Sequence, residues 1–289
     1  MMTKSIVTGL SLVLLTLSPA CEVPHDYQRR EFSAAPPATH APFEVLVRFP
    51  AGGVSIEAGK GRLLYHAFVT HCTVHSSAGA ELIEGGRQNP SRLTLSLLGK
   101  PGVFVGFGGE RNHMDLSLSP EPPVILDLDL GEGESVLSLG GLKVRGLKLS
   151  AGAGDTRLIF ATANPESPDQ IQIDEPIGDL SIDWLGNANA RHVDIQGGVG
   201  AIELDLAGQW RQDAVVTIGA SVGDVMLRLP KGGPGIRLEA GSPWGDNLSV
   251  EGLTRHDKAL YSDGYDAATP KLDIRIEAGI GELTVASSS

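Results

Sequence analysis

Alternation of apolar and polar residues over short stretches is the dominant pattern of the chain. In "IELDL", residues 202–206, Ile202, Leu204 and Leu206 fall on one side and the two acids between them on the other. A period of two is typical of a β-strand with one buried face. The alternation recurs in "VMLRL", "GIRLEA" and "LSIDW", and no ten-residue stretch has helical periodicity. The pattern predicts an all-β protein.

Glycine turns separate these strands at a nearly constant spacing. The units "GEGE", "GAGD", "PIGD", "GVGA", "SVGD", "PWGD" and "GIGE" align on one glycine, with spacings of 21, 24, 22, 23, 22 and 36 residues. The aligned glycines are Gly133, Gly154, Gly178, Gly200, Gly223, Gly245 and Gly281. Two short strands per period of ~22 residues predict a single-domain β-solenoid or β-roll, with regular rungs from about residue 124. A phosphate-binding loop would instead occur once, before a helix.

Two groups of polar residues resemble metal ligands. An acidic residue follows most of the aligned glycines: Glu134, Asp155, Asp179, Asp224, Asp246 and Glu282. Calcium-binding repeats have a nine-residue period, so we interpret these acids as turn residues that cap backbone N–H groups or stay solvated. In "HAFVTHCTVH", His71 and His75 share a strand face but are about 13 Å apart, too far for one ion. We therefore expect neither a metal site nor a cofactor.

The N-terminus has the features of an export signal. In residues 1–20, Lys4 precedes an apolar run, and "SPAC" supplies small residues before Cys21. Cys21 occupies the position of the lipidated cysteine of bacterial lipoproteins, which predicts a lipid anchor; plain cleavage after Ala20 is the alternative. Residues 21–42 contain four prolines and are predicted to be a Pro/Ala-rich tether to a domain spanning residues 43–289.

Composition narrows the classes of function. The chain is 41% hydrophobic but only 5% aromatic, which predicts an aliphatic core, and its formal charge of -12 argues against nucleic-acid binding. Cys72 is predicted to be a buried thiol. "LKVRGLKLS" opposes the overall charge, since Lys143, Arg145 and Lys148 point outward. They form a candidate patch for an anionic partner, or they neutralise acids on neighbouring rungs.

The spacing of 36 residues before Gly281 indicates an insertion at residues 252–268. This polar loop contains Tyr261 and Tyr265, and a solenoid needs its terminal rung covered. We expect the loop to belong to the C-terminal cap, with both hydroxyls toward water. The alternative is a loop that contacts a ligand through these tyrosines.

The repeats resemble the toast-rack domain of cell-wall-active-antibiotic response proteins, the LiaF-like group. The resemblance rests on the glycine turns, the ending "LDIRIEAGIGELTV" and the stretch "GGPGIRLEAGSPWGDNLSVEGLTRHDKALYSDGYD", and it covers residues 43–289. It implies a β-roll at a bacterial envelope, with regulatory or scaffolding roles in stress sensing and no established catalysis. LiaF-like proteins usually carry transmembrane helices ahead of the domain, where this chain has a signal and a tether.

We therefore expect an exported, non-catalytic binding or scaffolding protein of the bacterial cell envelope, held at a membrane by its lipid anchor or else secreted or periplasmic. Its partner would be an envelope protein or a cell-wall polymer, linked to envelope stress. The alternative is a β-helix enzyme or binding module acting on acidic polysaccharide, which would need clustered acids or bases on one sheet. The outward charged residues spread over several strands: Asp183, Glu203, Asp205, Arg228, Asp273 and Arg275. We interpret them as a solvated face.

Overall fold

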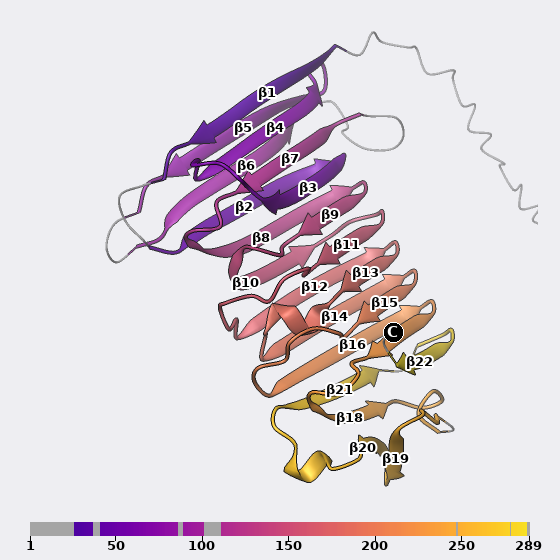
Figure 1. Ribbon diagram of the computed structural model, residues 1–289. Helices are drawn as coiled ribbons and strands as arrows, with labels where there is room; N and C mark the ends of the chain where they lie inside the picture. Colours follow the sequence, from indigo (N-terminus) through magenta and orange to yellow (C-terminus); the bar gives the residue numbers. More distant parts are fainter. Residues whose placement is uncertain are drawn as a thin grey trace, which may run out of the picture.

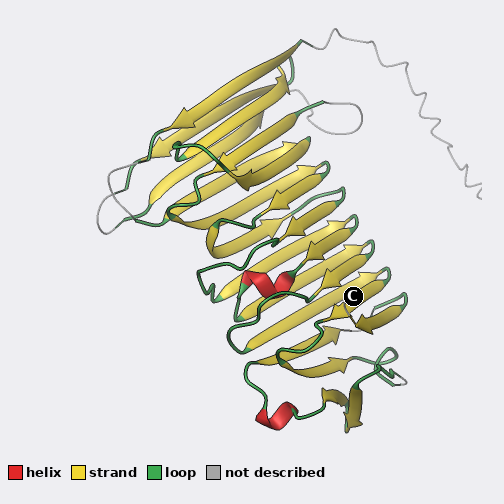
Figure 2. Cartoon of the chain, in the orientation of Figure 1, coloured by secondary structure: helices red, strands yellow, loops and turns green. Residues whose placement is uncertain are grey.

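The computed structural model is an all-β molecule in which two long sheets face each other across an aliphatic core (Figure 1). It describes residues 26–36, 41–85, 89–100, 111–246, 248–277 and 279–287. Within these ranges the helical elements are two 3-10 turns, η1 (Leu185–Ala188) and η2 (Tyr265–Ala267), drawn in red in Figure 2. No helix in the described ranges has the length and apolar character needed to cross a membrane. The predicted β-roll class is confirmed.

The two sheets run the length of the molecule. In spatial order, the 10-stranded sheet contains β1 (Tyr27–Ala34), β4 (Tyr65–Cys72), β7 (His113–Leu118), β3 (Gly53–Ala58), β9 (Ser135–Ser138), β11 (Thr156–Ile159), β13 (Leu180–Asp183), β15 (Ile202–Asp205), β17 (Val225–Leu229) and β22 (Leu283–Ser287). The 12-stranded sheet contains β19 (Leu253–His256), β20 (Ala259–Ser262), β18 (Gly235–Ala240), β21 (Lys271–Glu277), β16 (Ala214–Val222), β14 (His192–Val199), β12 (Gln170–Ile177), β10 (Lys143–Ser150), β8 (Pro123–Glu132), β2 (Phe43–Ala51), β6 (Ser91–Gly99) and β5 (Ser76–Ile83).

Each regular rung is one strand of the 12-stranded sheet, a glycine turn and one strand of the 10-stranded sheet. Successive rungs pair in parallel and in register, so that Ile195 lies opposite Ile218 and Leu204 opposite Leu227. All four side chains are buried, because the period-two pattern directs them between the sheets. Regular rungs begin with β8, and the aliphatic core predicted from the low aromatic content is present.

The turn glycines form a ladder along one edge of the molecule. Gly133, Gly154, Gly178, Gly200, Gly223 and Gly281 have φ between 138° and 148°, a region that other residues rarely adopt. Each also lies against the glycine of the preceding rung: a β-carbon on Gly200 would be 1.9 Å from the carbonyl oxygen of Gly178. Both the backbone angle and the space therefore require glycine.

The glycine ladder differs from the predicted alignment at two positions, Gly245 and Gly52. Gly245 is not among the glycines with positive φ, and β18 leads into no strand of the 10-stranded sheet, so the prediction of a rung turn there is wrong. The spatial neighbour of Gly223 in the ladder is Gly281. At the other end, Gly52, with φ 121°, joins β2 to β3 and extends the ladder by one rung. Matching tetrapeptides alone did not distinguish these cases.

The N-terminal end departs from a simple stack. Strands β2 and β3 form a rung, the chain then inserts β4 to β7, and β6 and β7 pair in parallel with β2 and β3. Strand β1 pairs antiparallel with β4 along its whole length. The prediction of a tether is therefore wrong for Tyr27–Ala34. Most of its side chains are exposed, so backbone pairing, with Phe32 packed on the core, holds a segment that lacks apolar periodicity.

The C-terminal end has an inverted strand order. Strand β21 lies between β16 and β18, although β18 precedes it in the chain. The insertion at residues 252–268 contains β19 and β20, and β20 pairs antiparallel with β18. The insertion thus covers the end of the 12-stranded sheet, as the predicted cap required, but it covers β18 rather than the rung of β21 and β22.

The acids after the glycines bind the turns together. The carboxylate of Asp155 accepts a hydrogen bond from the backbone N–H of Asp179 at 3.2 Å, and Asp179 accepts one from Ala201 at 2.8 Å. Asp224 accepts one from Glu282 at 2.9 Å. The interpretation of these acids as caps of backbone N–H groups is confirmed at these three positions, and each cap joins two rungs.

A carboxyl group lies inside the core near this turn edge. Glu175 is 1% exposed, on the inner face of β12, and neither of its carboxylate oxygens has a partner in hydrogen-bonding geometry. Burial raises its pKa from 4.5 to about 7, with a smaller opposing effect from the Thr156 hydroxyl. At the same inner position the neighbouring strands carry small residues, Gly197 on β14 among them, which leaves room for the longer side chain.

Glu175→Gln should stabilise the protein above neutral pH and leave its stability unchanged below about pH 4. An acid whose folded pKa is raised ionises first in the unfolded state, so stability falls as pH rises from 4.5 to about 7. We expect a gain of about 1–3 kcal/mol at pH 8, measured as the melting temperature of both proteins across pH. Glu277→Gln, an exposed acid on β21, is the control. An equal shift of the melting temperature at pH 4 and pH 8 would contradict the raised pKa of Glu175.

Candidate functional site

A row of side chains, all polar except Val215, crosses the outer face of the 12-stranded sheet at its C-terminal end. Strand pairing places one residue from each of seven strands side by side in the order Gln170, His192, Val215, Asp273, Arg237, Tyr261 and Thr254. With strands about 4.8 Å apart, the row is about 29 Å long. The parallel register of the rungs therefore builds an extended polar surface from residues far apart in the sequence.

Arg237 is the centre of this row. It donates Nη1–H to Asp273 at 2.7 Å and Nε–H to the Tyr261 hydroxyl at 3.2 Å, and it forms an ion pair with Glu239. Arg275 binds the other oxygen of Asp273 at 2.7 Å. Burial alone lowers the pKa of Arg237, but its hydrogen bonds outweigh that effect and raise the pKa overall. The guanidinium stays charged and holds Tyr261 in a fixed orientation.

The first hollow along the row is the tyrosine groove, with a volume of about 700 Å³. Its lining consists of Arg237, Thr254, His256, Asp257, Tyr261, Ser262, Asp263, Gly264, Tyr265, Asp266 and Ala267. Tyr261 contacts the ring of Tyr265 edge-on at 5.1 Å and the ring of His256 at 5.9 Å. The lining of the groove thus combines three aromatic rings with three aspartates. Apolar rings beside polar acceptors suit a ligand that has both apolar faces and hydrogen-bond donors.

The second hollow, the His192 hollow, lies beside the groove across β21 and has a volume of about 490 Å³. Arg191, His192, Gln212, Asp213, Ala214, Val215, Lys271 and Asp273 line it. Lys271 connects the two hollows, because its ammonium lies 4.9 Å from the centre of the Tyr265 ring. His192 donates Nδ1–H to the carbonyl of Asp169 at 3.1 Å, which leaves Nε2 as its outward atom. The two hollows form one elongated surface.

The structure places the predicted loop tyrosines at this surface. Both are half-buried, on β20 and η2. The Tyr261 hydroxyl bonds Arg237, so the expectation that it points only to water is wrong. Burial, followed by the charge of Asp273, raises the pKa of Tyr265, whose hydroxyl therefore keeps its proton at neutral pH. The insertion is at once the cover of the sheet end and one wall of the groove.

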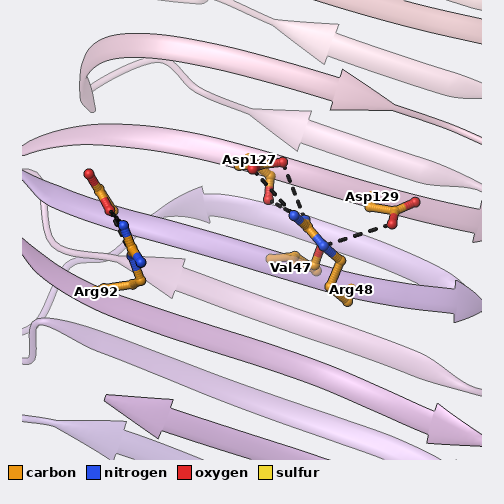
Figure 3. A network of polar contacts seen from close by, with 6 residues as sticks. Val47, Arg48, Arg92, Asp127 and Asp129 are labelled. Atoms are coloured by element: carbon orange, nitrogen blue, oxygen red, sulfur yellow. Dashed lines mark hydrogen bonds and ion pairs between the residues drawn. The ribbon is translucent and has the colours of Figure 1, made fainter. Parts of the chain in front are cut away.

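The basic patch of Lys143, Arg145 and Lys148 lies apart from this surface, on β10. Lys143 donates to the carbonyl of Glu121 at 2.8 Å. Lys148 lies opposite Asp127 of β8, whose carboxylate already binds Arg48 of β2 through two contacts of 3.3 Å (Figure 3). Arg48 also lies 3.8 Å from Asp129. Glu121, in the turn before β8, neutralises Lys143 through its carboxylate, 3.9 Å from the ammonium, while Arg145 and Lys148 stay exposed.

The other predicted polar residues are distributed over both sheets. Asp183 binds Arg157 at 2.6 Å and Glu203 lies 3.5 Å from Arg228 on the 10-stranded sheet, whereas Asp273 and Arg275 belong to the 12-stranded sheet. In the histidine segment, His66 points outward to Glu31 at 2.7 Å and His71 is buried. Among the described residues, no three histidines, cysteines or acids converge as metal ligands would. Cys72 is a buried thiol, as predicted.

The candidate lipid anchor Cys21 and the export signal at residues 1–20 lie outside the described residues.

One part of the chain matches the model of a known protein family. The model of the N-terminal domain of toast_rack, DUF2154, matches residues 41–183. Over these residues the chain is similar to the toast_rack family. The matched part runs from β2 to β13, so the tyrosine groove and the His192 hollow lie beyond it. No curated protein matches the sequence.

Several solved structures are similar to the chain at low identity. A proposed cell adhesion protein from Clostridium sporogenes ATCC 15579 is 16% identical, with a TM-score of 0.45 over 91% of this chain and 100% of that chain. A proposed adhesin from Bacteroides fragilis NCTC 9343 is 11% identical, with a TM-score of 0.37 over 90% of this chain and 97% of that chain.

Sequence reasoning missed most of the groove. It selected the two tyrosines for their place in an insertion, but it treated Asp273 as solvated and did not consider His256, His192 or Arg237. Arg237 and Asp273 are 36 positions apart in the sequence, and only the insertion of β21 beside β18 brings them together. An in-register alignment of β14, β16 and β21 would have grouped His192 with Asp273, since both lie opposite Val215 of the strand between them.

Proposed function

We propose that the protein is a non-catalytic binding protein of the bacterial cell envelope, and that its C-terminal surface binds a polysaccharide chain of the cell wall. The observation that carries the proposal is the continuous surface of the tyrosine groove and the His192 hollow. It is elongated across the sheet, which suits a polymer rather than a small molecule. Aromatic faces can pack on the apolar faces of sugar rings, and the carboxylates, Lys271 and Gln212 can bond their hydroxyl and amide groups.

Charge limits the class of polysaccharide. The rim of the groove carries Asp257, Asp263 and Asp266, which would repel a polyanion. An uncharged or N-acetylated glycan fits better than the acidic polysaccharide of the alternative hypothesis. The carboxylate of Asp273 is held in ion pairs with both Arg237 and Arg275, so we assign it to positioning rather than to acid–base chemistry.

The envelope location rests on the N-terminus and the family. The export signal, the candidate anchor at Cys21 and the resemblance to LiaF-like proteins all favour presentation at an envelope. The match of residues 41–183 to the toast-rack model supports that resemblance. We infer a scaffolding role in which β2 to β13 act as a spacer between the membrane and the binding surface, with a link to envelope stress carried by the bound wall polymer.

Tyr265→Ala should weaken binding of chitohexaose, an uncharged N-acetylated glycan, at least tenfold, because it removes one aromatic wall of the groove. Titration calorimetry measures the affinity, and thermal melting checks that the fold is kept. Trp184→Asn, which removes an exposed aromatic beside η1, is the matched control and should bind like the wild type.

Equal affinity of Tyr265→Ala and the wild type would contradict the assignment of the tyrosine groove as the glycan-binding site. Absence of binding by the wild type at millimolar glycan would contradict it as well. Tighter binding of polygalacturonate than of chitohexaose would favour the acidic-polysaccharide alternative. Shortened oligosaccharides detected by mass spectrometry after incubation would contradict the non-catalytic assignment.

A further inference from the structure

The glycine-turn edge of the molecule has an apolar crest. Ile177, Val199, Val222 and Ile280 each precede a ladder glycine, and their side chains are 56%, 56%, 43% and 73% exposed. They are neighbours in register: Ile177 pairs with Val199, Val199 with Val222, and Val222 with Ile280. Single exposed aliphatic residues are ordinary on a protein surface, but four in one continuous row mark an interaction surface. We call this row the aliphatic spine.

The spine offers side chains rather than backbone. The carbonyl of Val199 accepts a hydrogen bond from Gly178 at 2.9 Å, Val222 accepts one from Gly200 at 3.0 Å, and Ile280 accepts one from Gly223 at 2.8 Å. Because these bonds connect successive rungs, the edge has no open ladder to which a partner strand could pair. An occupant must therefore pack apolar side chains on the spine.

Acids border the spine on both sides. The four eight-residue segments around it, residues 174–181, 196–203, 219–226 and 277–284, contain seven acidic residues, of which only Glu175 is buried, and no Lys, Arg or His. Toward the 10-stranded sheet, Asp179 and Asp224 each use one carboxylate oxygen for a backbone N–H of the next rung, and the other oxygen remains for a partner. Toward the 12-stranded sheet lie the exposed Asp174 and Glu277. An apolar crest between two acidic borders is complementary to an apolar stripe between two basic borders.

We propose that the aliphatic spine is a docking site for a cationic amphipathic helix of a partner peptide or protein. The spine spans three rung spacings, about 14 Å, which is close to three turns of helix, about 16 Å. Apolar residues at helical spacing would contact successive spine residues, while Lys or Arg on either flank would reach the acids. The spine follows the ends of the strands whose beginnings carry the His192 row, so this site is separate from the glycan surface.

The test measures binding of a 14-residue Leu/Lys peptide, designed with all leucines on one helical face, to the full chain by fluorescence anisotropy. Val199→Ser combined with Val222→Ser should weaken binding at least tenfold. The matched control is Ile83→Ser with Leu98→Ser, which removes two aliphatic side chains of similar exposure, 55% and 59%, at the opposite end of the molecule. The control should bind like the wild type, and circular dichroism should show helix formation by the peptide on binding.

Two outcomes would overturn the site. The first is equal binding by the spine variant and the wild type. The second is equal binding of a peptide with the same composition in scrambled order, which would reduce the interaction to the general attraction of an acidic protein for cations. Loss of chitohexaose binding by the spine variant would show that the two surfaces are not separate, whereas failure of the glycan experiment alone leaves the peptide result standing.

Discussion

Leu204→Asp is expected to lower the melting temperature by about 10 °C or more and to make the unfolding transition less cooperative. Leu204 is fully buried in β15, between Ile182 of β13 and Leu227 of β17. An unpaired charge or a protonated carboxyl without a partner at this position costs about 4 kcal/mol. Because each rung contacts only its neighbours, the damage should spread from the centre of the stack to both sides. Thermal melting followed by circular dichroism measures the effect.

Glu203→Ala is the control for this substitution. Glu203 is the adjacent residue on the exposed face of β15, 3.5 Å from Arg228, and an exposed ion pair contributes little to stability. Its removal should change stability by less than about 0.5 kcal/mol. Similar shifts for both variants would mean that the two faces of β15 do not differ in burial.

Gly200→Ala is expected to destabilise the protein by about 2–5 kcal/mol, as the sum of backbone strain and overpacking. At φ 148° the residue lies where a β-carbon is strained, and that β-carbon would be 1.9 Å from the carbonyl oxygen of Gly178. Relief requires separation of two rungs, which would break the hydrogen bond from Gly178 N–H to the Val199 carbonyl. Chemical denaturation monitored by tryptophan fluorescence measures the loss.

Gly232→Ala separates the two causes. Gly232 also has a positive φ, of 72°, but a β-carbon there would meet nothing within 4 Å. Only the backbone strain remains, about 1 kcal/mol. If Gly200→Ala is no more destabilising than Gly232→Ala, the contact between successive glycines has no energetic role.

The repeating part of the fold was predictable because its physics is local. A strand with period-two burial, such as Ile202–Asp205, and a turn that only glycine can adopt are both visible in a single rung. Repetition then multiplies a weak signal. The same argument explains the confirmed role of Asp155 and Asp179, since a carboxylate one residue after a tight turn is placed to accept backbone N–H groups whatever the rest of the chain does.

The ends were less predictable because they depend on contacts between distant segments. Nothing within Tyr27–Ala34 identifies a strand; its order comes from pairing with β4. Similarly, the turn at Gly245 resembles the others in sequence, yet β21 takes the place beside β16 that a sequential stack would give to β18. The candidate site is the part least predictable from the sequence. Its central pair, Arg237 and Asp273, forms only because β21 lies between β16 and β18.

The aliphatic spine, in contrast, was available from the sequence. Ile177, Val199, Val222 and Ile280 occupy the same column of the glycine alignment, one position before the ladder glycine. Alternation alone does not settle whether that column is buried, because the chain is turning there. The structure shows that the column is the outermost part of the turn and therefore faces solvent.

The place of β21 between β16 and β18 also constrains how the molecule is assembled as it is made. A ribosome or an export channel delivers β18 well before β21, so neither β16 nor β18 can pair with β21 until residue 277 has emerged. Until then the facing edges of both strands are exposed, and direct pairing of β16 with β18 is a ready competitor. Rungs nearer the start can close one after another during delivery, whereas this step must wait for β21. The proposed glycan surface, which needs Arg237 beside Asp273, therefore cannot form before β21 has emerged.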